Sequence, residues 1–316
     1  MLDVSTQVVQ PIIDGLFEGG ILALAALGLS MIFSTLGVLN LAHGDFIMLG
    51  GFVGFLVSES LFSFARLGIF SIIGVLVSAF VVIAAFGAMY ELAFIRFIQK
   101  RSMTDVLISS ILVTVGTSFV IETVGYQLFP TVIPFGLTTF SINFPVQSLS
   151  INYGPISIEG AYIIAFITIA VSTLALYFFS RRTYLGKAMR AISQNRESAL
   201  LMGINPNRIS MLTFALGSGF GALAGVSVAM STLLSPGVGI GFTISLLAVL
   251  VLGGTGSYFG PLVGGITIGL VEAFVQTDGS GLAEWYPAVS IIILIVVLMI
   301  RPTGLTGKRS GGIVRT

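Results

Sequence analysis

GLSMIFSTLGVLNLAHGDFIMLGGFVG, residues 28–54, sets two apolar runs on either side of a short polar core. This core, Asn40-Leu41-Ala42-His43-Gly44-Asp45, holds the only histidine of the chain beside an amide and a carboxylate, and Gly44 can break or bend a helix. Ionisable groups at membrane depth are costly and are usually kept for a reason. The stretch therefore predicts two membrane helices separated by a polar break.

The composition of the whole chain agrees with this. Of 316 residues, 55% are hydrophobic and only 9% are charged, whereas roughly a quarter is charged in a soluble domain. The mean hydropathy of +1.07 is spread along the chain, and the first fourteen residues lack the basic start of a signal peptide. With no cysteine and one histidine, the sequence excludes disulfide frameworks, cysteine-based zinc sites and thiol nucleophiles.

Apolar segments long enough to span the membrane recur along the chain. A helix needs about 20 residues to cross the hydrocarbon core, and fewer where it is broken or re-entrant. We predict an all-α, polytopic bundle of about 8–10 spans, with broken or re-entrant helices around 233–265, in one transmembrane domain covering 1–316. The expected spans are 15–37, 45–60, 69–95, 104–129, 160–180, 210–232, 242–256, 260–276 and 287–301.

Basic residues set the orientation, because Lys and Arg collect on the cytoplasmic side. All except Arg66 fall into three groups, near 96–101, 181–208 and 301–315, which the predicted spans place on one side. The segment 130–158 then lies outside. Its prolines and its alternation of apolar with Ser or Asn residues predict short strands or a hairpin, either as a plain connector or as a cap that meets a partner.

Small residues recur at a spacing of four, which allows close approach of membrane helices and predicts a tightly packed bundle. They are Gly217, Gly221 and Gly225, Gly50 and Gly54, and Gly256, Gly260 and Gly264.

Two sets of polar residues are candidates for a translocation pathway. In the first, Asn40, His43 and Asp45 either line a substrate path and fix a helix break, or form an interfacial turn in which His43 and Asp45 bond each other or nearby backbone. The second is a stripe at four-residue spacing, which either lines the path or bonds neighbouring helices. It comprises Ser110, Thr114, Ser118 and Glu122, with Thr117 beside it. Glu18, Glu91 and Glu272 fall near span ends, where solvation at the interface explains them.

The segment 181–209, RRTYLGKAMRAISQNRESALLMGINPNRI, carries a net charge of +5. It contains a plausible short helix over 196–202, capped by Ser193 or Asn195 and stopped by Gly203, with Pro206 beyond. Ala199, Leu200, Met202 and Ile204 give this helix an apolar edge between charged ends. The edge favours docking of a partner, and the alternative is a basic loop against lipid headgroups.

We find no enzymatic motif and expect no catalytic, metal-binding or cofactor-binding residue. The sequences around Lys187 and Lys308 lack the glycine and the Ser/Thr of a phosphate-binding loop. HExxH and GxSxG are also missing, so the chain is not expected to be an enzyme or to bind ATP in that way.

Three ordered blocks resemble the LivH-type permeases of branched-chain amino acid ABC importers, the superfamily that also holds urea and short-amide permeases. GLSMIFSTLGVLNLAHGDFIMLGG resembles the first signature of the family, and LAVLVLGGTGSYFGPLVGGITIGLVEA with Arg301-Pro302-Thr303-Gly304 resembles its C-terminal pattern. GKAMRAISQNRESALLMGINPNRI resembles its cytoplasmic coupling segment, in which Glu197, Ala199 and Gly203 match the Glu-Ala-Ala-x-x-x-Gly pattern and Ser198 replaces the middle alanine. Asp45 stands where Glu is commoner, and 104–158 is the least familiar region, which leaves the substrate open.

The resemblance implies a subunit of a bacterial-type cytoplasmic (inner) membrane importer. Its partners would be a second, homologous permease chain, two cytoplasmic ATPases that use ATP and magnesium, and a periplasmic or extracellular binding protein; no nucleic acid is expected. The ATPase would act through Arg196, Glu197, Ala199, Leu200, Met202 and Gly203. A stand-alone secondary transporter or channel, with Glu122 or His43 as its ion group, and a membrane scaffold without transport are the alternatives from other classes.

Overall fold

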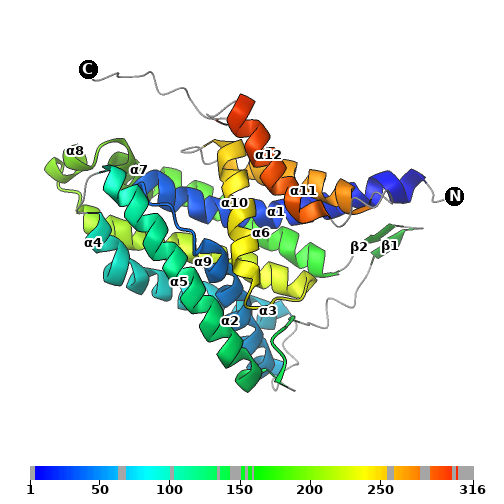
Figure 1. Ribbon diagram of the computed structural model, residues 1–316. Helices are drawn as coiled ribbons and strands as arrows, with labels where there is room; N and C mark the ends of the chain where they lie inside the picture. Colours follow the sequence, from blue (N-terminus) through cyan, green and yellow to red (C-terminus); the bar gives the residue numbers. More distant parts are fainter. Residues whose placement is uncertain are drawn as a thin grey trace.

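The computed structural model describes residues 4–62, 69–99, 103–133, 136–142, 151–153, 156–158, 160–254, 260–277, 285–300 and 304. Nearly all of these residues are helical (Figure 1). In chain order, the elements are α1 (Val4–Leu36), α2 (His43–Phe62), α3 (Ile69–Tyr90), the π-helical turn η1 (Glu91–Ile95), α4 (Arg96–Ile98), α5 (Met103–Val132), β1 (Ile151–Tyr153), β2 (Ile156–Ile158), α6 (Gly160–Arg182), α7 (Tyr184–Gln194), α8 (Arg196–Leu201), α9 (Pro206–Ser231), α10 (Val238–Gly253), α11 (Gly260–Thr277) and α12 (Tyr286–Ile300).

The predicted membrane spans each overlap a helix. Within the described ranges, six stretches are long and apolar enough to cross a membrane: Val8–Leu36, Phe70–Ile98, Asp105–Val132, Gly160–Arg182, Pro206–Ser231 and Gly260–Thr277. Two shorter apolar helices, Val238–Gly253 and Ala288–Ile300, and the 20-residue α2 match the remaining predictions. The expected all-α polytopic bundle is therefore confirmed, and the chain is a multi-pass membrane protein.

Two predicted spans were shorter than the helices that contain them. α1 begins at Val4 and passes through Pro11, and α5 continues through Pro130 to Val132. Pro130 lies in the last turn of α5, so it removes one hydrogen bond, to the carbonyl of Tyr126, at the very end of the helix. Proline there therefore does not mark the end of the helix, as the sequence suggested.

The central helices differ sharply from the outer ones in burial. In α1 and α9 the apolar windows are 78% and 72% buried, whereas in α5 the corresponding window is 22% buried. The outer helices α3, α5 and α6 expose large apolar side chains such as Phe70, Leu112 and Phe166. These surfaces suit lipid or a partner membrane subunit rather than water.

Close contacts at glycine hold the centre together, as the four-residue spacing predicted. A methyl group added at Gly217 of α9 would lie 2.8 Å from the carbonyl oxygen of Gly28 in α1, and one at Gly54 of α2 would lie 2.8 Å from Val226. A second crossing, between α1 and α11, escaped the sequence analysis. There Gly15 and Gly19 of α1 lie against Gly265 and Gly269 of α11. Gly256 lies outside the described residues.

Two helices begin inside the bundle. α1 ends at Leu36, and the chain turns back through Gly37, whose φ of 65° is left-handed. α2 then starts at His43, which reaches the backbone of Ala25, about 16 Å back along α1 at 1.5 Å per residue. α10 likewise starts after a turn at 232–237, and its first residues meet the start of α2. The expected broken or re-entrant helices are present.

The two ends of the molecule carry different elements (Figure 1). α4, α7 and α8 gather at one end, and the N-terminus with β1 and β2 lies at the other. β1 and β2 form an antiparallel hairpin in which Asn152 pairs with Ser157, which confirms the hairpin expected within 130–158. Phe140 also forms a bridge with Leu234, just beyond α9. Residues 143–150 of this segment lie outside the described part.

Candidate functional site

The break between α1 and α2 is held by hydroxyl groups from two other helices. Thr114 of α5 accepts a hydrogen bond from the Leu41 N–H (3.1 Å). Thr243 of α10 accepts one from the Gly44 N–H, and its oxygen lies 3.0 Å from the Leu41 carbonyl oxygen. Backbone groups freed by a helix break must find partners inside a membrane protein. These two threonines supply them.

Asp45 lies where the first turns of α2 and α10 meet. It is 1% exposed and stands in the first turn of α2, and a methyl group at Gly239 of α10 would overlap its carboxylate. Helix N-termini carry partial positive charge, so a carboxylate between two of them is stabilised without a basic side chain. Gly239 is required here because it leaves room for that carboxylate.

Two buried polar atoms around this junction make no hydrogen bond with the described residues. They are Asn40 Nδ2 and His43 Nδ1, whereas the Ser118 hydroxyl interacts with the Asp45 carboxylate. His43 Nε2 lies 3.2 Å from the Ala25 carbonyl oxygen, which only accepts, so Nε2 carries the proton and Nδ1 is an unused acceptor. Unpaired buried polar atoms are uncommon and call for a water or a ligand. The junction thus offers donors and acceptors to a small polar solute.

The two sets of pathway candidates lie together. Ser110, Thr114 and Ser118 are buried on the face of α5 nearest the break, and Thr114 bonds Leu41 directly. Glu122 is half-buried beside Gly237, at the start of α10. Thr117, next to the stripe, bonds the Tyr90 hydroxyl of another helix (2.9 Å), as the packing alternative supposed. His43 bonds the backbone of α1, and no bond joins it to Asp45 among the described residues, so only the backbone contact of the interfacial alternative is found.

The basic segment 181–209 is mostly helical rather than a loop. Arg181 and Arg182 end α6, and α7 follows with Ala188, Met189 and Ile192 buried and Lys187 exposed. α8 then runs from Arg196 to Leu201. Of the two predicted caps, Asn195 is the one used: its side chain accepts from the Ser198 N–H at 2.9 Å. Gly203 has a φ of 80°, and Pro206 begins α9, as expected.

The exposed edge of α8 differs from the prediction in three residues, one of which is Ile204, which is half-buried and packs against the core. Leu200, Leu201 and Met202 are 59%, 88% and 82% exposed, so the edge is stronger than expected. Ala199, predicted to belong to it, is 3% exposed because it faces the interior of the chain. Leu201 was missed, since helical periodicity was applied across a helix of only six residues. Glu197 is exposed in the first turn.

Arg196 fastens α8 to two neighbouring elements. Its guanidinium donates to Gln99 Oε1, just after α4, at 2.9 Å and to Asn207 Oδ1 in α9 at 3.4 Å. Gln99 also accepts from the Ser210 hydroxyl of α9. Burial lowers the pKa of the Arg196 guanidinium, and the nearby carboxylate of Glu91 opposes that shift. We call Glu91, Arg96, Gln99, Arg196 and Asn207 the coupling corner.

Comparison with known proteins identifies the family of the chain. The family model described as "Branched-chain amino acid transport system / permease component" matches residues 12–298. The chain belongs to this permease family. It is 31% identical to the high-affinity branched-chain amino acid transport system permease protein BraD of Pseudomonas aeruginosa and 30% identical to the LivH protein of Escherichia coli K12, over 95% of each chain. A probable LivH of Methanocaldococcus jannaschii is 26% identical over 94% of this chain and 92% of its own.

The sequence analysis placed three carboxylates at solvated span ends. That prediction was wrong for Glu91 and Glu272, which the permease buries. Glu91 is 0% exposed and ion-paired with Arg96 at 3.2 Å. Glu272 is 7% exposed and accepts a hydrogen bond from Ser290. Glu18 is half-buried, more than three turns into α1, because that helix begins earlier than predicted.

Sequence reasoning also missed residues whose role depends on a distant partner. Gln99 and Asn207 flank basic groups and carry amides that suit a guanidinium, but nothing in their spacing pairs them with Arg196. Thr243 and Gly239 sit four residues apart in a mainly apolar helix, where Thr243 and Ser245 carry hydroxyls and nothing in the sequence shows which of them meets the break.

Proposed function

We propose that this permease imports branched-chain or other hydrophobic amino acids and is driven by ATPase subunits that dock on α8. The observation that carries the proposal is the exposed edge Leu200-Leu201-Met202 on a helix that is capped at Asn195 and fastened by Arg196. An apolar edge of this kind, held rigidly between charged groups, is typical of a docking surface. The names of the relatives supply the substrate class.

Motion of α8 has a direct route to the helix break. α9 starts five residues after α8, and Arg196 bonds Asn207 in its first turn. Further along α9, Gly221 faces His43 and Gly225 lies against the backbone of Ile47 in α2. A displacement of α8 would therefore shift α9 against the start of α2. Rigid helices in close contact transmit such movements better than side chains on a mobile loop.

The proposed pathway passes the junction of α2 and α10. Asn40 and His43 present unpaired polar atoms there, beside Asp45 and Ser118, which interact with each other. Ser110, Thr114 and Glu122 continue the polar face along α5. A polar amino acid backbone would exchange hydrogen bonds with these groups as it crosses. Their burial inside one chain requires the bundle to open during transport, which is the work assigned to the ATPase.

The proposed assembly contains a second, homologous permease chain, two cytoplasmic ATPases that use ATP and magnesium, and an external binding protein, in the cytoplasmic membrane. Three features support it: the exposed apolar faces of the outer helices, the docking edge of α8, and the absence of a phosphate-binding loop in the sequence. Urea or short amides are the alternative substrates of the same mechanism.

Reconstitution tests the proposal. Proteoliposomes with the complete importer should accumulate leucine, isoleucine or valine when ATP and the binding protein are supplied. Glu197→Ala and Gly203→Val should fold and assemble but lower uptake per ATP hydrolysed, because a β-branched residue is strained in the left-handed turn that ends α8. Full ATP-driven uptake by both variants would contradict the role of α8.

Reconstitution also distinguishes the importer from a stand-alone secondary transporter or channel. Liposomes that hold this chain alone should show no uptake under an imposed proton or sodium gradient. Uptake that follows such a gradient would instead indicate a secondary transporter or channel, with Glu122 or His43 as the group to replace first.

A further inference from the structure

A cavity of about 540 Å³ lies between α1, α6, α9, α10, α11 and α12. It is on the side of α10 that carries Val238 and Phe242, and it reaches the end of α9 farthest from α8, at Ser231. Its volume is within the range of small-molecule sites, roughly 300–1,000 Å³. Neither the pathway residues discussed above nor α8 line it.

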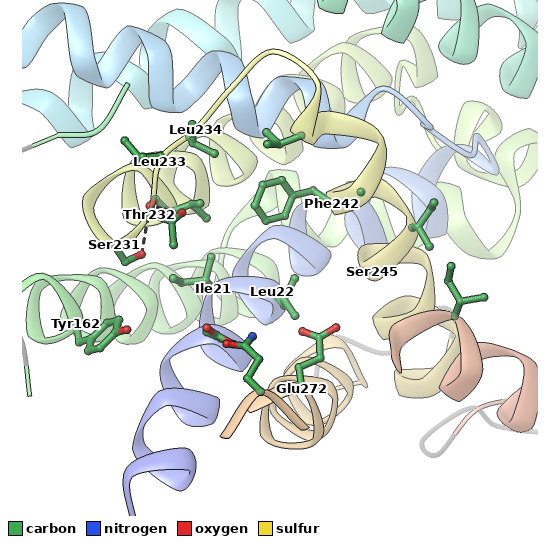
Figure 2. Close-up of a pocket in the computed structure, with 17 residues that line it drawn as sticks. Ile21, Leu22, Tyr162, Ser231, Thr232, Leu233, Leu234, Phe242, Ser245 and Glu272 are labelled. Carbon is green, nitrogen blue, oxygen red and sulfur yellow. Dashed lines mark hydrogen bonds between the residues drawn. The ribbon is translucent and has the colours of Figure 1, made fainter. Parts of the chain in front are cut away.

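The wall of the cavity is mainly apolar. Figure 2 shows Ile21, Leu22, Leu234 and Phe242 around the same space as Glu272. Such a lining suits an aliphatic group, since burying each CH₂ contributes about 0.8 kcal/mol. The cavity therefore fits a small ligand with a branched apolar part.

Two carboxylates, Glu18 of α1 and Glu272 of α11, also line the cavity and interact electrostatically. The described lining contains no lysine, arginine or histidine. Ser290 donates a hydrogen bond to one oxygen of Glu272, and Ser290 in turn contacts Ser245 (3.2 Å), so hydroxyls hold the carboxylate in place without neutralising it. A carboxylate that is 93% buried without a counter-ion is costly, and a cationic ligand removes that cost.

We propose that this cavity binds the permeating amino acid before it reaches the helix break, with the ammonium group at Glu18 and Glu272 and the aliphatic side chain against α10. The inference deepens the proposed function and rests on it for the identity of the amino acid. Gln276, exposed one turn beyond Glu272, offers amide N–H groups to the carboxylate of the ligand. The chemistry recognised is a primary ammonium on a branched aliphatic chain.

Two variants remove different parts of the site. Glu272→Gln removes the charge but keeps an oxygen for Ser290. Gly241→Leu fills the cavity, because a side chain at Gly241 meets no atom within 4 Å. Each has a matched control outside the cavity: Glu59→Gln on the exposed end of α2, and Gly116→Leu on α5, where an added methyl group also meets nothing within 4 Å.

The test is equilibrium binding to the purified importer complex without ATP, using leucine, 3-methylbutylamine and 4-methylpentanoate. We expect the first two to bind and the acid, which lacks the ammonium group, to bind at least tenfold more weakly. Glu272→Gln and Gly241→Leu should weaken the binding of leucine and of the amine about tenfold or more, as expected for loss of a charge-assisted contact. Both controls should bind like the wild type.

Equal affinity of Glu272→Gln and the wild type for the amine would overturn the inference, as would equal binding of amine and acid. Phosphatidylethanolamine carries the same ammonium group, so binding is repeated in nanodiscs with and without this lipid; loss of leucine binding in its presence would identify a lipid site and overturn the inference. Because the measurement needs no ATP, its failure is separate from failure of ATP-driven uptake, which would contradict the proposed function instead.

Discussion

The coupling corner and the cavity both bury a carboxylate, but they surround it with different partners. At the coupling corner, Glu91 lies 3.2 Å from Arg96 and is also close to Arg196. In the cavity, Glu272 and Glu18 lie among mainly apolar side chains, and Glu272 accepts a hydrogen bond from the Ser290 hydroxyl. A paired carboxylate stabilises one arrangement of helices, whereas an unpaired one is costly unless a mobile cation visits it. The difference separates a structural charge from one reserved for a ligand.

The largest expected effect comes from breaking the pair. Arg96→Ala leaves Glu91 fully buried with only the more distant Arg196 to offset its charge. Loss of one partner of a buried pair is strongly destabilising, and because Arg96 is 31% exposed we expect about 2–3 kcal/mol off the free energy of unfolding. Denaturation of the purified chain in detergent measures it, with Arg182→Ala, exposed at the end of α6, as the control. Equal stability of both variants would show that Glu91 needs no partner.

A neutral amide at the two carboxylates should act in opposite directions. Glu91→Gln removes the attraction to Arg96 and should lower the free energy of unfolding by about 1–2 kcal/mol. Glu272→Gln keeps its bond to Ser290 and removes an uncompensated charge, so stability should stay the same or rise. The two melting temperatures in the same detergent make the comparison. A fall of equal size in both would mean that the cavity carboxylate is structural too.

A smaller change weakens the hydrogen bonds of the coupling corner but keeps its charges. Arg196→Lys keeps the positive charge near Glu91 but cannot donate to Gln99 and Asn207 in the same planar geometry. We expect a loss of about 1 kcal/mol in stability and a lower ratio of substrate transported to ATP hydrolysed. The ratio in proteoliposomes is the measurement that matters, because an unchanged ratio would confine Arg196 to a structural role.

The smallest effect is expected in the cavity wall. Ser245→Ala removes the 3.2 Å contact to the Ser290 hydroxyl but leaves Ser290 bonded to Glu272. The expected loss of stability is about 0.5–1 kcal/mol. A loss as large as that of Arg96→Ala would show that Ser245 belongs to a structural network, and it would contradict the difference proposed between the cavity and the coupling corner.

Much of the fold was predictable because membranes impose simple rules. Apolar length located the helices, glycine spacing marked close packing on α2 and α9, and Asn195 with Gly203 bounded α8. These signals are local, so a single sequence contains them. The polar core at 40–45 was also visible, as was the stripe on α5 that turned out to contact it.

Pairings between distant residues were not predictable. Nothing near Glu91 in the sequence points to Arg196, and nothing near Glu18 points to Glu272, since both contacts depend on how the helices pack. The burial of Ala199 and the exposure of Leu201 likewise follow from the tilt of α8 against α7 and α9. A charged residue near the predicted end of a span can therefore be either solvated at the interface or buried between helices, and only the packing of the helices shows which.

The central claim is that α8 docks on an ATPase subunit, and cross-linking tests it most directly. The chain has no cysteine, so Met202→Cys, 82% exposed in the parent, creates its only thiol for a short photo-cross-linker. Leu112→Cys on the exposed face of α5 (68%) is the control. In the assembled importer, the account predicts a cross-link to the ATPase from position 202 and none from position 112. No ATPase cross-link from position 202 in an intact complex, or equal cross-links from both positions, would contradict it.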